Sequence, residues 1–198
     1  NSDDKNGKYM LQNTKAKKYT YALKSIADYK SQVLENQFNG LLLKINGQEL
    51  WVKLIGNFNA YNLLAIYAVA DLLGLENLEI LQLMSELESV DGRFQYVVSK
   101  NNITAIVDYA HTPDALEVSL KSLKDYFKNK KISIVFGCGG DRDKAKRPMM
   151  GKIANEYCDK IYLTDDNPRD ENPKKIRNSI SKNINKSKIY EISNRANA

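Results

Sequence analysis

The sequence predicts an α/β fold whose second half forms a mainly parallel sheet, and three observations support this prediction. From residue 93 to residue 192, short apolar runs with strand character alternate with longer segments of helical period. A proline opens each helical segment, and two of the strands run into clusters of Gly, Asp, Asn and Arg. Such alternation indicates right-handed βαβ units on a largely parallel sheet, which binds ligands at the carboxyl ends of its strands.

The first half of the chain predicts a β-hairpin followed by two helices. Asn46-Gly47 separates the strand-like runs 38–45 and 48–55, and both central positions of such a turn need positive φ. Apolar residues at helical spacing then predict a helix over 60–73, which Gly74 ends, and another over 78–87.

The second half predicts five strands and three helices, and the boundary between the halves falls near residues 89–92. We therefore expect one domain over 1–90 and another over 91–198. Proline suits the first helical position, where its missing N–H costs nothing. The expected strands are 93–99, 103–108, 132–136, 160–164 and 188–192, and the expected helices are 113–129, 148–158 and 173–183.

Composition restricts the class of protein. The chain has 198 residues, 42% hydrophobic and 27% charged, with no apolar stretch of bilayer length and no signal-peptide pattern. Cys138 and Cys158 are too few for a disulfide framework and lack metal-ligand spacing, so we expect a cytoplasmic protein without a membrane partner. The net charge of +6 comes from lysines spread along the chain, so we expect no nucleic-acid partner.

Both ends of the sequence look cut. The first residue is Asn1 rather than Met, and the chain stops just as a helix begins around Arg195. We expect a piece of a larger polypeptide.

Two short motifs in the middle of the chain have a structural and a functional interpretation. Asn59 and Asn62 are three residues apart at a helix start, which puts both amides on one face, although Asn57 or Asn59 can also simply be the N-cap. Arg93 follows Asp91-Gly92 at the junction between the halves. It can reach a phosphate across a cleft or simply be an exposed arginine beside a hinge glycine.

The segment 107–114 turns from a strand end into a helix start and holds His111, the one histidine of the chain. Asp108 at the strand tip can bind ribose hydroxyls, and His111 or Tyr109 can stack on a base. The structural alternative is that Thr112 or Asp114 caps the helix and His111 is a surface residue.

The most informative feature is a pair of charged segments after two neighbouring strands. Gly137-Cys138-Gly139-Gly140-Asp141-Arg142 follows the first strand, and Asp165-Asp166-Asn167-Pro168-Arg169 follows the second. The arginines can bind carboxylates bidentately, while Asp166 and Asn167 can hold an ammonium group. Both signs of charge suit a zwitterionic ligand such as an amino acid. The second segment is otherwise a plain turn, which leaves its arginine unexplained.

Taken together, these motifs resemble the Mur ligases of peptidoglycan synthesis, in order and over essentially the whole chain. The flanking segments from Asn1 to Asp4 and from Ser193 to Ala196 also match. Asp166 to Arg169 resembles the motif of the diaminopimelate-adding branch, whereas the lysine-adding branch lacks the final arginine.

The resemblance implies an ATP-dependent ligase that adds meso-diaminopimelate to UDP-MurNAc-L-Ala-D-Glu through an acyl phosphate. It implies a Rossmann-like C-terminal domain preceded by the last part of the central ATPase domain. Its implied nucleotide-binding residues are Asn59, Asn62, Arg93, Asp108 and His111, and its implied amino-acid-binding residues are Arg142, Asp166, Asn167 and Arg169.

The phosphate loop, the Mg²⁺ ligands and the UDP-binding domain of this family find no counterpart in the 198 residues. We therefore expect no catalytic residue and no metal ligand in this chain, and no ligation by the chain alone. Two alternatives stay open, namely a lysine-adding Mur ligase and a non-catalytic α/β module that binds a nucleotide or an amino acid.

Overall fold

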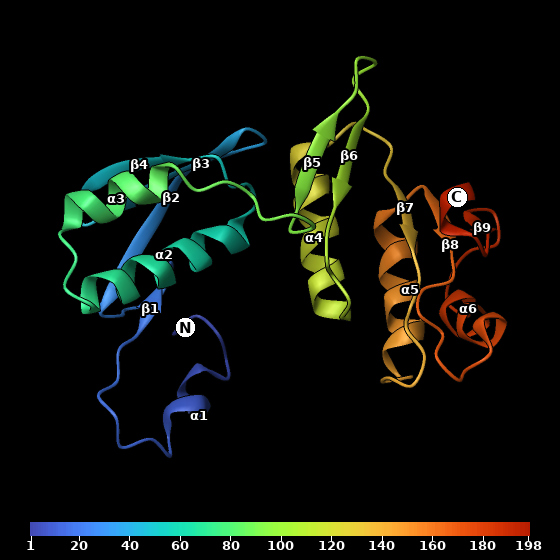
Figure 1. The fold of residues 1–198 in the computed structure, drawn as a ribbon, viewed down its shortest axis with the longest axis horizontal. Helices are drawn as coiled ribbons and strands as arrows, with labels where there is room; N and C mark the ends of the chain where they lie inside the picture. Colours follow the sequence, from blue (N-terminus) through green and yellow to red (C-terminus); the bar gives the residue numbers. More distant parts are fainter. The chain divides into compact units, whose positions relative to one another are not determined.

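The computed structural model describes residues 1–198, which divide into two compact units, Asn1–Val107 and Asp108–Ala198 (Figure 1). The division falls after β6 (Thr104–Val107). The sequence-based boundary between residues 90 and 91 instead precedes β5 (Gln95–Val98). Each unit has its own buried apolar core.

The first unit is built on a four-stranded sheet in the order β1-β2-β3-β4. The pair β1–β2 is parallel, and the pairs β2–β3 and β3–β4 are antiparallel. The short helix α1 and the strands β1 and β2 lie in a region for which the sequence predicted no elements. The elements are α1 (Gly7–Leu11), β1 (Tyr21–Ala22), β2 (Tyr29–Gln37), β3 (Gly40–Ile45) and β4 (Gln48–Val52).

The predicted hairpin is confirmed in β3 and β4. Asn46 has φ 49° and Gly47 has φ 80°, so both turn residues have the positive φ that the Asn-Gly signal requires. Ile45 pairs with Gln48 directly across this turn.

Two helices complete the core of the first unit, α2 (Asn57–Leu72) and α3 (Asn77–Ser85). Leu41, Leu43 and Ile45 alternate along β3 and are fully buried, so one face of the sheet is apolar. They pack with Leu63 and Tyr67 of α2, among others. Helix α2 begins three residues earlier than the sequence predicted.

The expectation of one largely parallel sheet is wrong for the first two strands of the second half. Strands β5 and β6 pair antiparallel in a separate two-stranded sheet, with Gln95 opposite Val107. The short connection through Asn102, at φ 58°, makes a hairpin. A parallel pair needs a crossover of a dozen or more residues, which is absent here.

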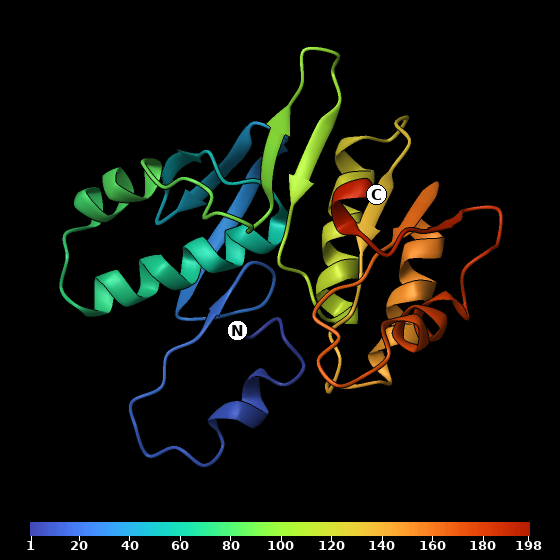
Figure 2. The same cartoon turned by 45° about the vertical axis from the view of Figure 1, so that its right-hand side comes forward.

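The second unit has the predicted parallel sheet, which confirms the α/β class. Its strands β7 (Ser133–Phe136), β8 (Lys160–Leu163) and β9 (Ile189–Glu191) pair in chain order. The connections are the helices α5 (Lys146–Tyr157) and α6 (Pro173–Ser181), and α4 (Pro113–Tyr126) precedes β7. Helix α5 packs against α4 and α6 (Figure 2).

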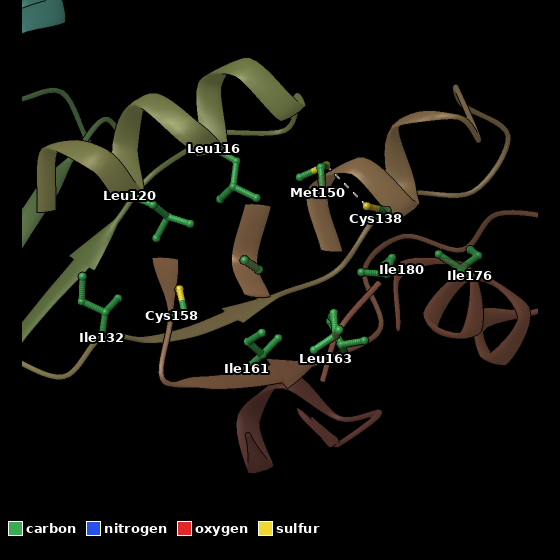
Figure 3. Packing of buried hydrophobic residues seen from close by; sticks show 12 residues of the cluster. Leu116, Leu120, Ile132, Cys138, Met150, Cys158, Ile161, Leu163, Ile176 and Ile180 are labelled. Atoms are coloured by element: carbon green, nitrogen blue, oxygen red, sulfur yellow. Dashed lines mark hydrogen bonds between the residues drawn. The ribbon is translucent and has the colours of Figure 1, made fainter. Parts of the chain in front are cut away.

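The core of the second unit lies between the sheet and these helices, as Figure 3 shows. Ile161 and Leu163 of β8 are fully buried. Leu120 of α4 and Ile180 of α6 belong to the same cluster. The alternation along β8 places one face of the sheet against the helices, and the charged loops follow the carboxyl ends of the same strands.

The prediction that a proline opens each helix is correct for α4 and α6 but wrong for α5. Helix α5 begins at Lys146, so Pro148 is its third residue. The N–H groups of the whole first turn lack helical acceptors, which is why proline is tolerated there too. None of the helices is both long and apolar enough to cross a bilayer.

Candidate functional site

The carboxyl ends of the three parallel strands lie side by side in the second unit. Phe136 of β7 pairs with Leu163 of β8, which pairs with Glu191 of β9. The Gly-rich loop after β7 and the acidic loop after β8 therefore start from neighbouring positions, as parallel topology requires.

These two loops pack directly against each other. The Gly140 N–H donates to the carbonyl of Asn167 at 2.8 Å, and Arg169 Nη1 donates to the carbonyl of Gly140 at 2.5 Å. A Cβ on Gly140 would lie 1.8 Å from the Pro168 carbonyl oxygen, and one on Gly137 would lie 2.4 Å from that of Thr164. The glycines thus permit close backbone approach, but the partner they admit is the other loop.

The predicted amino-acid-binding residues lie on these loops and are exposed. The backbone of Arg169 has φ 49°, and its N–H donates to Asn167 Oδ1 at 3.3 Å. Asp166 Oδ1 lies 3.4 Å from Arg195 Nη2. The structure brings Asp166, Asn167 and Arg169 together beside the Gly-rich loop that leads to Arg142. An exposed guanidinium, carboxylate and amide on one loop can bind a zwitterion.

The sequence did not reveal the buried arginine beneath these loops and its glutamate partner. Glu171 accepts from Arg147 Nη1 at 3.0 Å and Nη2 at 2.8 Å, and from the Asp141 N–H at 2.7 Å. Arg147 Nη2 also donates to the Gly139 carbonyl at 3.2 Å. The hydrogen bonds from Arg147 and then from the Asp141 N–H lower the pKa of Glu171 to about 2. No local signal separates Arg147 from a surface arginine, because its burial depends on the distant loop.

A second ion cluster holds the ends of β8 and β9. Arg177 of α6 pairs with Asp165 and, at 3.4 Å, with Glu191. Arg195 Nη2 donates to the Asp165 carbonyl at 3.4 Å. The acidic loop is therefore anchored at both of its ends, by Arg177 before the Asp166–Arg169 motif and by Arg147 after it.

Asp108 and His111 occupy the segment that leads into α4. Asp108 Oδ2 accepts from Ser119 Oγ at 2.5 Å, and Oδ1 accepts from the Tyr109 N–H at 2.9 Å. His111 is exposed, and its Nδ1 lies 3.1 Å from the Tyr109 carbonyl oxygen. The His111 and Tyr109 rings contact edge to face, with 5.2 Å between their centroids. Thr112 caps α4 by accepting from the Ala115 N–H at 3.3 Å. The cap is thus Thr112, which leaves Asp108 and His111 exposed.

In the first unit, Asn59 and Asn62 contact each other as their spacing predicted. Asn62 Nδ2 donates to Asn59 Oδ1 at 3.1 Å, and Asn59 Nδ2 donates to the Ile55 carbonyl at 2.8 Å. The N-cap of α2 is Gly56, without a side-chain cap, so the capping interpretation of the asparagines is wrong.

Arg93 lies in a tight turn before β5. Its N–H donates to the Val90 carbonyl at 2.9 Å, and Ser89 Oγ donates to the Arg93 carbonyl at 2.7 Å. The next residue, Phe94, is buried with φ 51° and packs edge to face on Phe58 at 5.4 Å. This packing fixes the backbone at Arg93 while its side chain is exposed.

A metal centre is not formed by the residues of this chain. No group of three or more His, Cys, Asp or Glu side chains is placed to hold an ion. The acids at the strand ends are instead paired with an arginine, as for Asp165 and Glu191 with Arg177.

Comparisons with known proteins show which family this chain resembles. Residues 92–198 match the family model described as Mur ligase, glutamate ligase domain. A protein from Cytophaga hutchinsonii named UDP-N-acetylmuramoyl-L-alanyl-D-glutamate–2,6-diaminopimelate ligase is 47% identical over 100% of this chain and 41% of its own length. A protein of the same name from Parabacteroides distasonis is 50% identical over 94% of this chain and 38% of its own length.

A solved structure of a ligase with this name is 35% identical, with a TM-score of 0.55, covering 90% of this chain and 38% of that one. The chain therefore spans about two-fifths of the length of the curated relatives that it matches. More than half of the chain matches the family model, and the match contains the parallel sheet and both loops at its edge. On this evidence the chain belongs to the Mur ligase family.

Proposed function

We propose that this chain is part of an ATP-dependent ligase that adds meso-diaminopimelate to UDP-N-acetylmuramoyl-L-alanyl-D-glutamate in peptidoglycan synthesis. The support is the name shared by relatives that are 47% and 50% identical. In this proposal residues 1–90 form the end of a central ATP-binding domain, and residues 91–198 form most of a C-terminal domain that binds the amino acid. The proposed compartment is the cytoplasm.

The proposed reaction has two steps. The γ-phosphoryl group of ATP is transferred to the γ-carboxylate of D-glutamate, which gives an acyl phosphate and ADP. The amine of diaminopimelate then attacks the carbonyl carbon, loses a proton and expels inorganic phosphate, so an amide bond forms. The residues of this chain bind and orient the two small substrates and carry out no covalent step. In this proposal the Mg²⁺ ligands are residues outside this chain.

The observation that carries the proposal is the position of Asp166–Arg169 at the carboxyl end of β8, packed against the Gly-rich loop. Asp166 and Asn167 supply oxygens for an ammonium group, and Arg142 and Arg169 supply guanidinium forks for carboxylates. Diaminopimelate carries one carboxylate more than lysine, so a further arginine is the expected selector.

The proposed nucleotide contacts are taken for each unit by itself, with Asp108 and His111 in the second unit and Asn59, Asn62 and Arg93 in the first. An ionised carboxylate has about four lone-pair positions. Asp108 already accepts from Ser119 Oγ and the Tyr109 N–H, and its exposed carboxylate can also accept from hydroxyl groups such as those of a ribose. The exposed ring of His111 suits contact with a base.

A parallel ligation assay tests this function. The full-length protein that carries this chain is incubated with ATP, UDP-N-acetylmuramoyl-L-alanyl-D-glutamate and either meso-diaminopimelate or L-lysine. We expect strong preference for diaminopimelate. Preference for lysine would reject Asp166–Arg169 as the selector, and activity with neither would favour a binding module without catalysis.

A further inference from the structure

The ion pair between buried Arg147 and partly exposed Glu171 joins three segments around the proposed amino-acid site. Glu171 follows the Asp166–Arg169 motif, and Arg147 lies in the first turn of α5. The carboxylate of Glu171 accepts from both terminal nitrogens of Arg147 and from the Asp141 N–H, and Arg147 also holds the Gly139 carbonyl. One ion pair therefore connects the helix, the Gly-rich loop and the acidic loop.

Further backbone contacts continue this connection toward the motif. The Asp170 N–H donates to Asp141 Oδ2 at 3.1 Å, and the Gly140 N–H donates to the Asn167 carbonyl at 2.8 Å. Arg169 Nη1 binds the Gly140 carbonyl. The Arg147–Glu171 pair lies at the end of this series of contacts, and Asn167 and Arg169 of the motif take part in it.

Burial makes Arg147 unsuited to direct ligand contact, and the carboxylate of Glu171 is already engaged by three hydrogen bonds. The side chain of Arg147 is 3% exposed and that of Glu171 is 16% exposed. A buried ion pair is weak evidence for stability, because desolvation offsets its attraction. A bidentate pair does fix orientation, since two parallel hydrogen bonds define the relative position of both partners. Whatever the pair contributes to stability, its bidentate geometry fixes the relative orientation of the two loops.

The backbone beside the pair needs such support. Asp141 has φ 48° and Arg169 has φ 49°, a left-handed conformation that residues other than glycine adopt at a cost. Conformations of this kind persist where surrounding contacts over-determine them. Asp141 gives its N–H to Glu171, and Arg169 is two residues before Glu171 along the chain.

We propose that Arg147 and Glu171 are positioning residues for amino-acid binding. They hold the left-handed turns at Asp141 and Arg169, and thereby set the orientation of the Asp166–Arg169 motif against the Gly-rich loop. This role rests on the proposed function, because the motif is the proposed amino-acid site. Glu171 and Arg147 act through the loops and do not touch the substrate.

The test uses Glu171→Gln and Arg147→Lys in the full-length protein. The first removes the charge that Arg147 binds, and the second keeps a charge but loses the bidentate fork. Glu191→Gln is the matched control, because it removes one carboxylate from Arg177 in the same unit while Asp165 remains. The Michaelis constants for the amino acid and for ATP are measured together with amide hydrogen exchange.

We expect both variants to raise the Michaelis constant for the amino acid by about ten- to hundredfold, as misplaced binding groups do. The Michaelis constant for ATP should change less than about twofold, because sites that share no contacts respond to substitutions independently. Amide protection at Gly140, Asp141 and Asp170 should fall in both variants, while protection at Ile161 shows that the sheet is intact. The control should resemble the wild type in all of these measurements.

Unchanged amide protection at Asp141 and Asp170 would overturn the proposal, and so would lost protection with an unchanged amino-acid constant. If Glu171→Gln does not fold, Arg147→Lys decides the outcome by the same criteria. The choice of the wild-type protein between diaminopimelate and lysine tests the proposed function separately. If the wild-type protein uses lysine, the proposal of diaminopimelate as substrate is wrong. The positioning role of Arg147 and Glu171 is then tested with the Michaelis constant for lysine.

Discussion

Arg169 combines a left-handed backbone with a guanidinium group that lies on the carbonyl of Gly140. The Gly140 carbonyl accepts a hydrogen bond from Nη1 of the guanidinium group, and the residue as a whole is exposed. Its remaining N–H donors are thus available for a carboxylate.

We predict that Arg169→Ala in the full-length protein raises the Michaelis constant for diaminopimelate by about ten- to hundredfold. This range corresponds to the free energy of about 1.5–3 kcal/mol that a hydrogen bond between charged groups contributes. The constant for ATP should be nearly unchanged. Arg169→Lys is the control that keeps the charge without the fork, and it should be intermediate. Equal losses for both substrates would remove Arg169 from the amino-acid site.

Asp108 offers a similarly specific test at the nucleotide site. We predict that Asp108→Ala raises the Michaelis constant for ATP by about tenfold, because a hydrogen bond to a charged group is lost, and spares diaminopimelate. Ser119→Ala removes the hydroxyl that donates to the same carboxylate at 2.5 Å and leaves the carboxylate in place. If Ser119→Ala has the same effect as Asp108→Ala, Asp108 acts only on the local structure.

At the scale of elements, the loops after β7 and β8 behave as one packed unit. Gly140 is buried against the backbone of Pro168, whereas Gly139 faces the far end of a flexible side chain. A Cβ on Gly139 would lie 3.0 Å from Arg169 Nη1, which can move. The two neighbouring glycines therefore differ in what an added methyl group displaces.

We predict that Gly140→Ala destabilises the second unit by about 3 kcal/mol, because the clash with a backbone carbonyl requires the loops to separate. Gly139→Ala should cost less than about 1 kcal/mol, since only a side chain has to shift. Amide exchange at Ile161 and Leu163 measures both values. Similar costs for the two variants would contradict close packing of the two backbones at Gly140.

At the scale of the whole molecule, each unit has a carboxylate whose pKa lies below its ordinary range. Hydrogen bonds from Ser25 and from the backbone N–H groups of residues 23–25 lower the pKa of Asp3 in the first unit. Arg147 and the Asp141 N–H lower the pKa of Glu171 in the second unit from 4.5 to about 2. Both carboxylates favour the folded state when ionised.

We predict that the second unit loses stability as the pH falls from about 4.5 toward 2. The contribution of Glu171 is complete above its unfolded-state pKa and disappears as the folded-state pKa is crossed. Glu171→Gln should flatten this part of the stability curve, as measured by amide exchange in β7 and β8 and corrected for intrinsic rates. Asp3→Asn, in the other unit, is the control and should leave the curve of the second unit unchanged. A steep acid loss that persists in Glu171→Gln would assign the effect to another group.

The sequence by itself determined the features that depend on a few neighbouring residues. Asn46-Gly47 specified the hairpin because both positions accept positive φ, and Pro113 and Pro173 marked helix starts because first-turn N–H groups lack acceptors. Strand–helix alternation predicted the parallel sheet, and that topology placed both charged loops at one edge.

Only the tertiary structure decided what depends on contacts between distant segments. Strand β2 was not recognisable because an irregularity between Val33 and Glu35 interrupts its alternation. The separate pairing of β5 and β6 depended on hydrogen-bond partners that periodicity does not specify. The burial of Arg147 and its pairing with Glu171, 24 residues away, required two loops to meet. Local propensity acts over a single turn or strand, whereas burial and pairing are set by the packing of the whole unit.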